Sequence, residues 1–177
     1  MTAFVLITGL AAVVLVLLRV LRIRQDLRMC REAALQTWAQ LKTELDHRRE
    51  MVPYVIAGTE VHAARAVETV GNACDLAGHA GGVPEVAIAE VRLTSALRRL
   101  FDLMDRDPAL SESPRLKPLR QRLDAAERQI EYLGDLYNDQ ARAFNGRLQE
   151  SLARVAAGFP MRHRLDLFEG AGFSKSG

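Results

Sequence analysis

The chain begins with the stretch MTAFVLITGLAAVVLVLLRVLRIRQDLRMCR, residues 1–31. Its first part, Met1 to Leu18, is uncharged and largely apolar. Five arginines follow this apolar run: Arg19, Arg22, Arg24, Arg28 and Arg31. A secretory signal peptide has the opposite order, because its positive charge comes first and a small-residue cleavage site comes last. The order in this chain is typical of a membrane anchor, and we expect a transmembrane helix over residues 1–23.

The arginine cluster predicts the orientation of that helix. Positive residues that flank a membrane span stay in the cytoplasm, so we expect the amino terminus outside and the rest of the chain inside the cell. Residues 1–18, at about 1.5 Å each, give roughly 27 Å of helix, near the lower limit for crossing hydrocarbon. Arg19 and Arg22 can extend their charged ends toward the headgroups, which lengthens the buried stretch. A soluble core helix is the alternative, but it would need a polar face, which this run lacks.

The net charge of +2 is unevenly distributed along the 177 residues. Residues 19–31 hold five arginines and one aspartate, a net charge of +4. Residues 32–177 hold nineteen basic and twenty-one acidic residues, a net charge of −2. Basic residues beside a membrane span attract anionic lipid headgroups, whereas a nucleic-acid surface would need a basic stripe with stacking aromatics, which we do not find. We therefore expect the membrane, and no nucleic acid, among the partners.

Heptad-like apolar spacing dominates the rest of the chain, and period-2 alternation is scarce. Four segments have this spacing: residues 27–52, 53–77, 86–104 and 114–155. Pro53 disfavours a helical Val52, so we expect a turn between the first two segments. Glycine, proline and acidic residues gather at 78–84 and 105–114, which predicts loops at both places.

These signals predict an all-α fold. We expect the transmembrane helix to lead into an antiparallel four-helix bundle with coiled-coil-like packing and long first and last helices. Residues 1–23 would form the anchor, residues 24–157 the bundle, and residues 158–177 an aromatic and basic tail whose last residues are disordered. The fourth helix returns to the membrane in such a bundle. We therefore expect a bend near Asn145-Gly146, followed by an interfacial segment.

Basic and aromatic side chains are expected together at the membrane interface. The stretch 147–168 mixes apolar and basic residues, a pattern typical of a segment that lies in the plane of an anionic membrane. Packing of the same apolar residues on the end of the bundle is the alternative. The residues expected at the interface are Arg19, Arg22, Arg24, Arg28, Phe159 and Phe168.

Polar and aromatic residues at inward positions are expected to set the register of the bundle. Arg48 falls at such a position, and it either extends outward with Arg49 or pairs with Glu127 or Asp124 on the last helix. An inward asparagine needs hydrogen-bond partners and can fix the same register, whereas a solvated one does not. The residues expected in this role are Trp38, Arg48, Tyr137, Asn138, Phe144 and Asn145.

The histidines do not form a pattern that predicts a metal site. Glu44 and His47 make one Glu-x-x-His pair. A di-iron bundle needs a second such pair, and His62, His79 and His163 do not provide it. We therefore expect no metal.

The remaining motifs also argue against an enzyme. Gly78 to Gly82 precede a predicted helix but lack the strand and the lysine of a phosphate-binding loop. Cys30 and Cys74 have neither zinc spacing nor a neighbouring histidine, and we interpret both as packed apolar residues. We expect no catalytic residue and no cofactor.

Several stretches resemble the LemA family, a group of bacterial membrane proteins. The motifs concerned are Trp38-Ala39-Gln40-Leu41, Arg48-Arg49 with Val52-Pro53, Ala126-Glu127 with Ile130, Tyr137-Asn138-Asp139, Phe144-Asn145, Gly158-Phe159 and Leu167-Phe168-Glu169. The most specific element is the aromatic-Asn pair, which occurs twice, seven residues apart. The chain departs from the family pattern at Tyr54, where an asparagine usually follows the proline, and at Phe144, where tyrosine is usual.

The resemblance implies a membrane-anchored helical bundle, and it implies architecture more than activity. We expect a non-catalytic scaffold or adaptor that recruits partners at the cell inner membrane and can associate with copies of itself. The alternative is an accessory or regulatory subunit of a membrane protease or transporter complex. The sequence identifies no protein partner.

Overall fold

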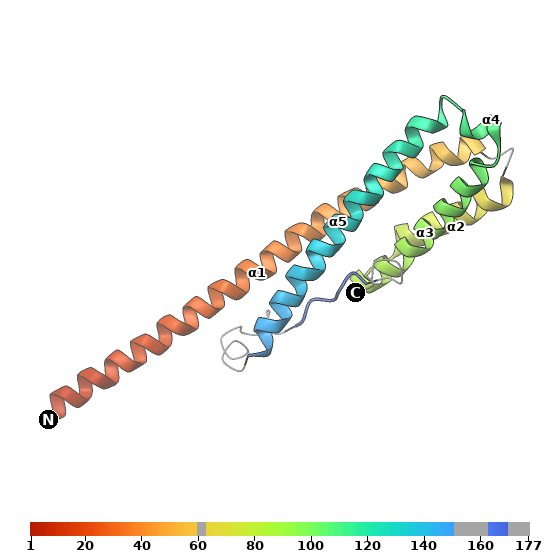
Figure 1. The fold of residues 1–177 in the computed structure, drawn as a ribbon. Helices are drawn as coiled ribbons and strands as arrows, with labels where there is room; N and C mark the ends of the chain where they lie inside the picture. Colours follow the sequence, from red (N-terminus) through yellow and green to blue (C-terminus); the bar gives the residue numbers. More distant parts are fainter. Residues whose placement is uncertain (60–62, 151–162, 170–177) are drawn as a thin grey trace. The chain divides into compact units, whose positions relative to one another are not determined.

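The computed structural model describes residues 1–59, 63–150 and 163–169, and within these ranges its secondary structure is helical, without a strand (Figure 1). In chain order the helices are α1 (Thr2–Thr59), α2 (Ala64–His79), α3 (Val83–Met104), α4 (Pro108–Ser111) and α5 (Leu116–Gln149). The predicted all-α fold class is confirmed. The longest of these helices, α1 and α5 with 58 and 34 residues, come first and last.

Contacts between residues divide the chain into two compact units. The first unit comprises residues 1–36 and 139–165, and the second unit comprises residues 37–138 and 166–177. Helices α1 and α5 each contribute residues to both units, whereas α2, α3 and α4 belong to the second unit alone.

Contacts in the second unit show the directions of its helices. Trp38 in α1 packs against Tyr137 late in α5, with ring centroids 5.4 Å apart. Gly58, near the end of α1, lies against Leu116 at the start of α5. The two helices are therefore antiparallel. Helices α2 and α3 pack together and are joined by the short connection 80–82, so they also run in opposite directions.

The interior of the second unit is apolar and receives side chains from all of its helices. Val70, Leu93 and Leu100 are fully buried there. Burial of each such side chain stabilises the fold by about 1.5–3 kcal/mol. Ala73 and Ala77 are the buried positions of α2 that follow Val70, and their small side chains let this helix approach its neighbours closely.

The turn predicted at Val52-Pro53 is absent, because α1 continues through Pro53 to its end. A proline inside a helix lacks the N–H that would donate to the carbonyl of Arg49, and its ring crowds that carbonyl. Pro53 itself is exposed, whereas Val52 and Val55 are buried in the core. Burial of these valines favours the helix despite the proline, and the next helix begins only at Ala64.

Helix α5 begins at Leu116 and continues past Asn145-Gly146 to Gln149. The expected bend therefore does not end the helix at this position. The interfacial segment expected after it falls mostly on residues 151–162, which lie outside the described residues. The expected end of the fourth helix and the expected disordered terminus lie outside them as well.

The loop predicted at 105–114 contains the short helix α4. Asp107 caps this helix, because its carboxylate accepts a hydrogen bond of 2.9 Å from the N–H of Ala109. Pro108 occupies the first position, where a proline is preorganised and no N–H is missed. The turn residues seen in the sequence thus initiate one turn of helix.

The first unit has its own small core. Its buried residues are Leu27, Phe144 and Leu148, with Ile23, Cys30 and Leu165 partly buried against them. Nη1 of Arg147 lies 2.9 Å from the sulfur of Cys30. Among the residues that the structure describes, no helix combines the length and the apolar character needed to cross a membrane. The transmembrane helix expected over residues 1–23 has no support from this finding and stays a prediction.

Replacing Pro53 by alanine should stabilise the protein. The substitution restores a backbone donor and removes a clash with the preceding turn, which together are worth up to about 3 kcal/mol inside a helix. We expect a higher midpoint of urea denaturation by circular dichroism. Pro84, in the first turn of α3, is the control, because Pro84→Ala removes a proline that fits its position and should not raise the midpoint. Equal denaturation midpoints for Pro53→Ala and Pro84→Ala would show that Pro53 does not destabilise α1.

Candidate functional site

The second unit contains a buried salt bridge between α1 and α3. Nη2 of Arg48 pairs with Oε2 of Glu90, and the two side chains are 2% and 0% exposed. Nη1 of Arg48 also donates a hydrogen bond of 2.7 Å to Oγ1 of Thr94. Nη1 of Arg49 lies 3.7 Å from Oε1 of the same glutamate. We call Arg48, Arg49, Glu90 and Thr94 the buried charge network.

The buried charge network joins three helices. Arg49 donates to the carbonyl oxygen of Ala77 in α2 and pairs with the exposed Asp46. Two guanidinium groups share one buried carboxylate, and Nε of Arg48 is buried without a hydrogen-bond partner. A buried ion pair adds little net stability, because desolvation offsets the attraction, but separating its partners costs several kcal/mol. The role in helix register that was expected for Arg48 therefore fits these contacts better than a large gain in stability, and it stays a prediction.

The partner of Arg48 differs from both alternatives that the sequence left open. Arg48 neither extends outward nor pairs with Glu127 or Asp124, because it is buried against Glu90. Glu127 instead accepts a hydrogen bond of 2.7 Å from the exposed Arg98. The sequence does contain a signal for the true partner, since Glu90 lies among the apolar positions of the third predicted helix. An acidic residue at such a position needs a cation nearby.

Cys74 lies in α2 and is half-buried. Burial raises the pKa of its thiol, Asp75 raises it further, and the nearby Arg49 lowers it by less. A thiol with a raised pKa stays protonated near neutral pH and is a weak nucleophile. Cys74 is therefore suited to packing rather than to covalent chemistry.

A cradle in the second unit holds the ring of Phe168. The ring is fully buried, and its centroid lies 5.9 Å from that of Trp38. Gly134 leaves room for it, because a Cβ atom at this position would lie 3.2 Å from Cδ1 of the ring. We call Trp38, Gly134, Tyr137 and Asn138 the aromatic cradle.

Tyr137 and Asn138 bind the main chain around Phe168. Nδ2 of Asn138 donates to the carbonyl oxygen of Phe168 at 3.0 Å, and Oδ1 accepts from the N–H of the same residue at 2.8 Å. The hydroxyl of Tyr137 donates to the carbonyl oxygen of Asp166 at 2.7 Å. Asn138 and Tyr137 are both buried, so losing their partners would leave polar groups unsatisfied away from water.

The second aromatic-Asn pair has the same kind of contacts in the first unit. Nδ2 of Asn145 donates to the carbonyl oxygen of Leu165, and Oδ1 accepts from its N–H, both at 2.8 Å. Phe144 is fully buried in the core of that unit. In each pair the aromatic ring faces an interior and the amide binds the main chain of a non-helical segment. The structure shows both asparagines bound to this segment, and the expectation that they set helix register stays a prediction.

The structure places Phe168 differently from the expected membrane interface. Its ring is covered by Trp38 and the backbone of Gly134, so it has no apolar surface left for lipid. This corresponds to the alternative in which the tail packs on the bundle. Phe159, the other aromatic residue expected at the interface, lies outside the described residues.

The arginines expected at the membrane interface lie along α1. Arg19, Arg22 and Arg28 are exposed, and Arg24 is half-buried with its Nε lacking a hydrogen-bond partner. Exposed guanidinium groups are available to lipid headgroups. Their contact with lipid stays a prediction.

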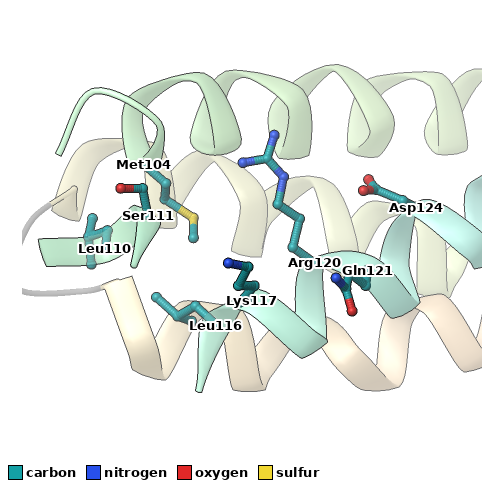
Figure 2. A pocket seen from close by; sticks show the side chains of 8 residues that line it. All are labelled: Met104, Leu110, Ser111, Leu116, Lys117, Arg120, Gln121 and Asp124. Carbon is teal, nitrogen blue, oxygen red and sulfur yellow. The ribbon is translucent and has the colours of Figure 1, made fainter. Parts of the chain in front are cut away.

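An open pocket of about 260 Å³ lies where α3, α4 and α5 meet (Figure 2). It is lined by Met104, Leu110, Ser111, Leu116, Lys117, Arg120, Gln121 and Asp124. Three of these residues, Met104, Leu110 and Leu116, are apolar and buried. The polar residues come mainly from the first turns of α5. The pocket therefore has an apolar part and a charged rim.

Arg120 at this rim is engaged with the end of α3. It forms an ion pair with Asp105, in which Nη2 lies 3.0 Å from Oδ2, and its guanidinium lies 5.2 Å from the ring centroid of Phe101. The hydrogen bond from Arg120 lowers the pKa of the Asp105 carboxyl and raises the pKa of Arg120 itself. The charge of Arg120 is thus directed to Asp105 rather than presented to a ligand.

The part of the chain that the structure describes contains no group of three or more histidine, cysteine, aspartate or glutamate side chains that could hold a metal ion. Glu44 is half-buried and His47 is exposed on α1. This places the Glu-x-x-His pair at the surface of the helix rather than inside the bundle.

Comparison with known protein families places most of the chain in one of them. The model of the LemA family matches residues 37–176. The matched range includes both the buried charge network and the aromatic cradle. None of the curated proteins compared with the chain matches it significantly.

Replacing Glu90 by glutamine should strongly destabilise the fold. The substitution leaves Arg48 buried without a counter-charge, and we expect a loss of about 3–5 kcal/mol in the free energy of unfolding. Urea denaturation followed by circular dichroism measures this loss.

The exposed ion pair of Arg98 and Glu127 provides a matched control. Glu127→Gln removes the same charge from a solvated pair and should cost no more than about 1 kcal/mol. Comparable losses in Glu90→Gln and Glu127→Gln would contradict the special role of the buried pair. The double variant Arg48→Met with Glu90→Leu should be less destabilised than Glu90→Gln alone, because it leaves no unpaired charge between these two positions.

The contribution of Tyr137 to stability should fall at alkaline pH. Burial raises the pKa of its phenol, and Asp166 raises it further. The folded state therefore holds this proton more tightly than the unfolded state. The resulting stability is complete below the ordinary tyrosine pKa of about 10 and is lost as the pH rises through the folded value.

We expect the stability difference between the wild type and Tyr137→Phe to be about 1 kcal/mol near neutral pH, from the hydrogen bond to Asp166. The difference should shrink at alkaline pH in urea titrations at several pH values. Tyr132→Phe, which removes an exposed phenol, controls for general effects of the substitution. A difference that stays constant with pH would contradict the assignment.

Proposed function

The chain belongs to the LemA family, and from this premise we propose that it is a single-pass membrane protein whose helical part is a scaffold or adaptor. In this proposal the protein has no catalytic activity of its own. It holds protein partners in place at the cell inner membrane.

The apolar run from Met1 to Leu18 carries the membrane part of the proposal. The side chains of Val13 to Leu18 on α1 are each at least 46% exposed. Because these residues are consecutive, their side chains cover every side of the helix. Burying one large apolar side chain is worth about 1.5–3 kcal/mol, so a lipid environment would stabilise this stretch far more than water does.

The arginines that follow the run support an orientation. Positive charge beside a span favours the cytoplasmic side. Each arginine near an anionic surface adds about 1 kcal/mol of attraction. The amino terminus would then lie outside, and the second unit would lie in the cytoplasm. The proposed interface no longer includes Phe168, because that ring lies in the aromatic cradle.

Two internal features favour a scaffold as the role of the second unit. The buried charge network ties α1 to α2 and α3, and the aromatic cradle ties α1 and α5 to a later segment. A part whose helices are held in one register can present its outer faces to partners in a constant geometry. The alternative role is that of an accessory subunit of a membrane protease or transporter. Identifying the partners that are crosslinked in intact membranes distinguishes this role from the scaffold. If the crosslinked partners belong to a single membrane protease or transporter complex, the result would favour the accessory subunit.

Cysteine labelling in intact spheroplasts tests the proposed topology. In a chain with Cys30 and Cys74 replaced by alanine, an impermeant thiol reagent should label Thr2→Cys from outside. Glu112→Cys should be labelled only after lysis, because this exposed position belongs to the second unit.

Two other results would count against the proposal. Labelling of Glu112→Cys before lysis would reverse the orientation. Recovery of the wild-type chain in the soluble fraction after alkaline carbonate extraction of membranes would contradict the anchor itself.

A further inference from the structure

A further hollow, of about 320 Å³, lies in the first unit, where residues of α1 meet the end of α5. Among the described residues it is lined by Ile23, Asp26, Leu27, Arg147 and Glu150. Leu27 is buried in the small core of this unit and Ile23 packs against that core. Asp26, Arg147 and Glu150 are exposed. The hollow therefore has an apolar floor and a rim with two carboxylates and one guanidinium, and we call it the charged hollow.

The opposite charges at this rim do not neutralise each other directly. None of the ion pairs within 4 Å that the described residues form involves Asp26, Arg147 or Glu150. Arg147 instead contacts α1 through Nη1, which lies 2.9 Å from the sulfur of Cys30. A simple anion or cation in this hollow would be repelled by one of the two signs. A ligand that carries both charges close together would find a partner for each.

The position of the charged hollow along α1 indicates where such a ligand comes from. A hydrocarbon core of about 30 Å takes about 20 residues of helix, so a span that begins at Met1 ends near Val20. Ile23 and Asp26 come three and six residues later, which is about 4.5 and 9 Å of helix. The headgroup layer on one side of a bilayer is about 5–7 Å deep. The hollow therefore lies at the level of the lipid headgroups if the anchor spans the membrane.

We propose that the charged hollow binds the headgroup of a zwitterionic phospholipid that carries a primary ammonium, as in phosphatidylethanolamine. Arg147 donates hydrogen bonds to the phosphate, and the carboxylates of Asp26 and Glu150 accept from the ammonium. Ile23 and Leu27 contact the apolar part of the lipid next to its headgroup. This inference rests on the proposed membrane anchor and adds a lipid specificity to it.

The chemistry of the rim distinguishes this lipid from other phospholipids. A primary ammonium has three N–H donors for the two carboxylates. The quaternary ammonium of phosphatidylcholine has the same charge but no N–H donor. Phosphatidylglycerol keeps the phosphate but has no cation, so the two carboxylates would repel it. The arginines of α1 attract any anionic lipid through long-range charge, whereas the charged hollow selects a headgroup that contains both signs.

Native mass spectrometry of the full-length chain in detergent micelles tests this selectivity. The probe is an equimolar mixture of phosphatidylethanolamine, phosphatidylcholine and phosphatidylglycerol with the same acyl chains. We expect the first bound lipid to be phosphatidylethanolamine roughly five times as often as phosphatidylcholine, as for one exposed charged interaction. Asp26→Asn combined with Glu150→Gln should abolish this preference. Glu32→Gln, which removes an exposed carboxylate of α1 outside the hollow, should keep it.

A second pair of variants tests the phosphate partner. Arg147→Gln should lower the amount of bound phosphatidylethanolamine severalfold, with helicity unchanged by circular dichroism. Arg28→Gln, which removes an exposed guanidinium outside the hollow, should leave this amount unchanged. Glycerophosphoethanolamine, which has the same headgroup without acyl chains, should displace the lipid only at a much higher concentration, because it lacks the apolar part that contacts Ile23 and Leu27.

The outcomes separate this site from the anchor on which it rests. A chain that stays in membranes after carbonate extraction but binds the three lipids equally has the anchor without the site. Preference for phosphatidylethanolamine that persists in Asp26→Asn with Glu150→Gln would also overturn the site. Displacement of the lipid by an equal concentration of glycerophosphoethanolamine would show that a soluble zwitterion, not a lipid, is the ligand. A chain that carbonate extracts from membranes would contradict the anchor and this inference together.

Discussion

Arg48 and Glu90 face each other in the interior of the second unit, where neither charge reaches water. Apolar side chains can slide past one another at a modest cost, but a buried charge without its partner costs about 3–5 kcal/mol. A shift of α1 along α3 by one residue would displace the guanidinium by about 1.5 Å. The hydrogen bond to Thr94 would be broken by the same shift. Burial of the apolar core stabilises every arrangement that keeps it buried, whereas the salt bridge favours the one arrangement in which both charges are paired.

The aromatic cradle depends on this selection. Trp38 is on the same helix as Arg48, so the axial position that suits the salt bridge also fixes the indole against α5. Only then can Tyr137 and Asn138 present their polar groups beside a space for Phe168. Several of the motifs by which the sequence resembles the LemA family therefore take part in one connected set of contacts. An inward arginine, a tryptophan and an aromatic-Asn pair support each other across α1, α3 and α5.

Much of the helical organisation could be predicted from apolar spacing, because this periodicity follows directly from burying one face of each helix. The continuation of α1 through Pro53 could not be predicted in this way. The local cost of the proline is offset by valines whose burial depends on tertiary packing. The inward position of Arg48 was visible from the sequence, but its partner was not. A residue in a bundle has several neighbouring helices, and spacing alone does not choose among them. Phe168 was misplaced because a segment of mixed apolar and basic residues suits both a membrane and a protein interior.

Gly134 occupies the middle of α5, where a glycine costs about 1 kcal/mol relative to alanine. The glycine is nevertheless suited to this position, because the ring of Phe168 packs where the methyl group of an alanine would lie. The residues at positions 134 and 168 therefore constrain each other sterically although they are far apart in the sequence. A relative that lost the aromatic residue would be free to strengthen its helix with alanine. Among relatives, a residue larger than glycine at position 134 should accompany a residue smaller than phenylalanine at position 168. This covariation would be visible in an alignment without any structure.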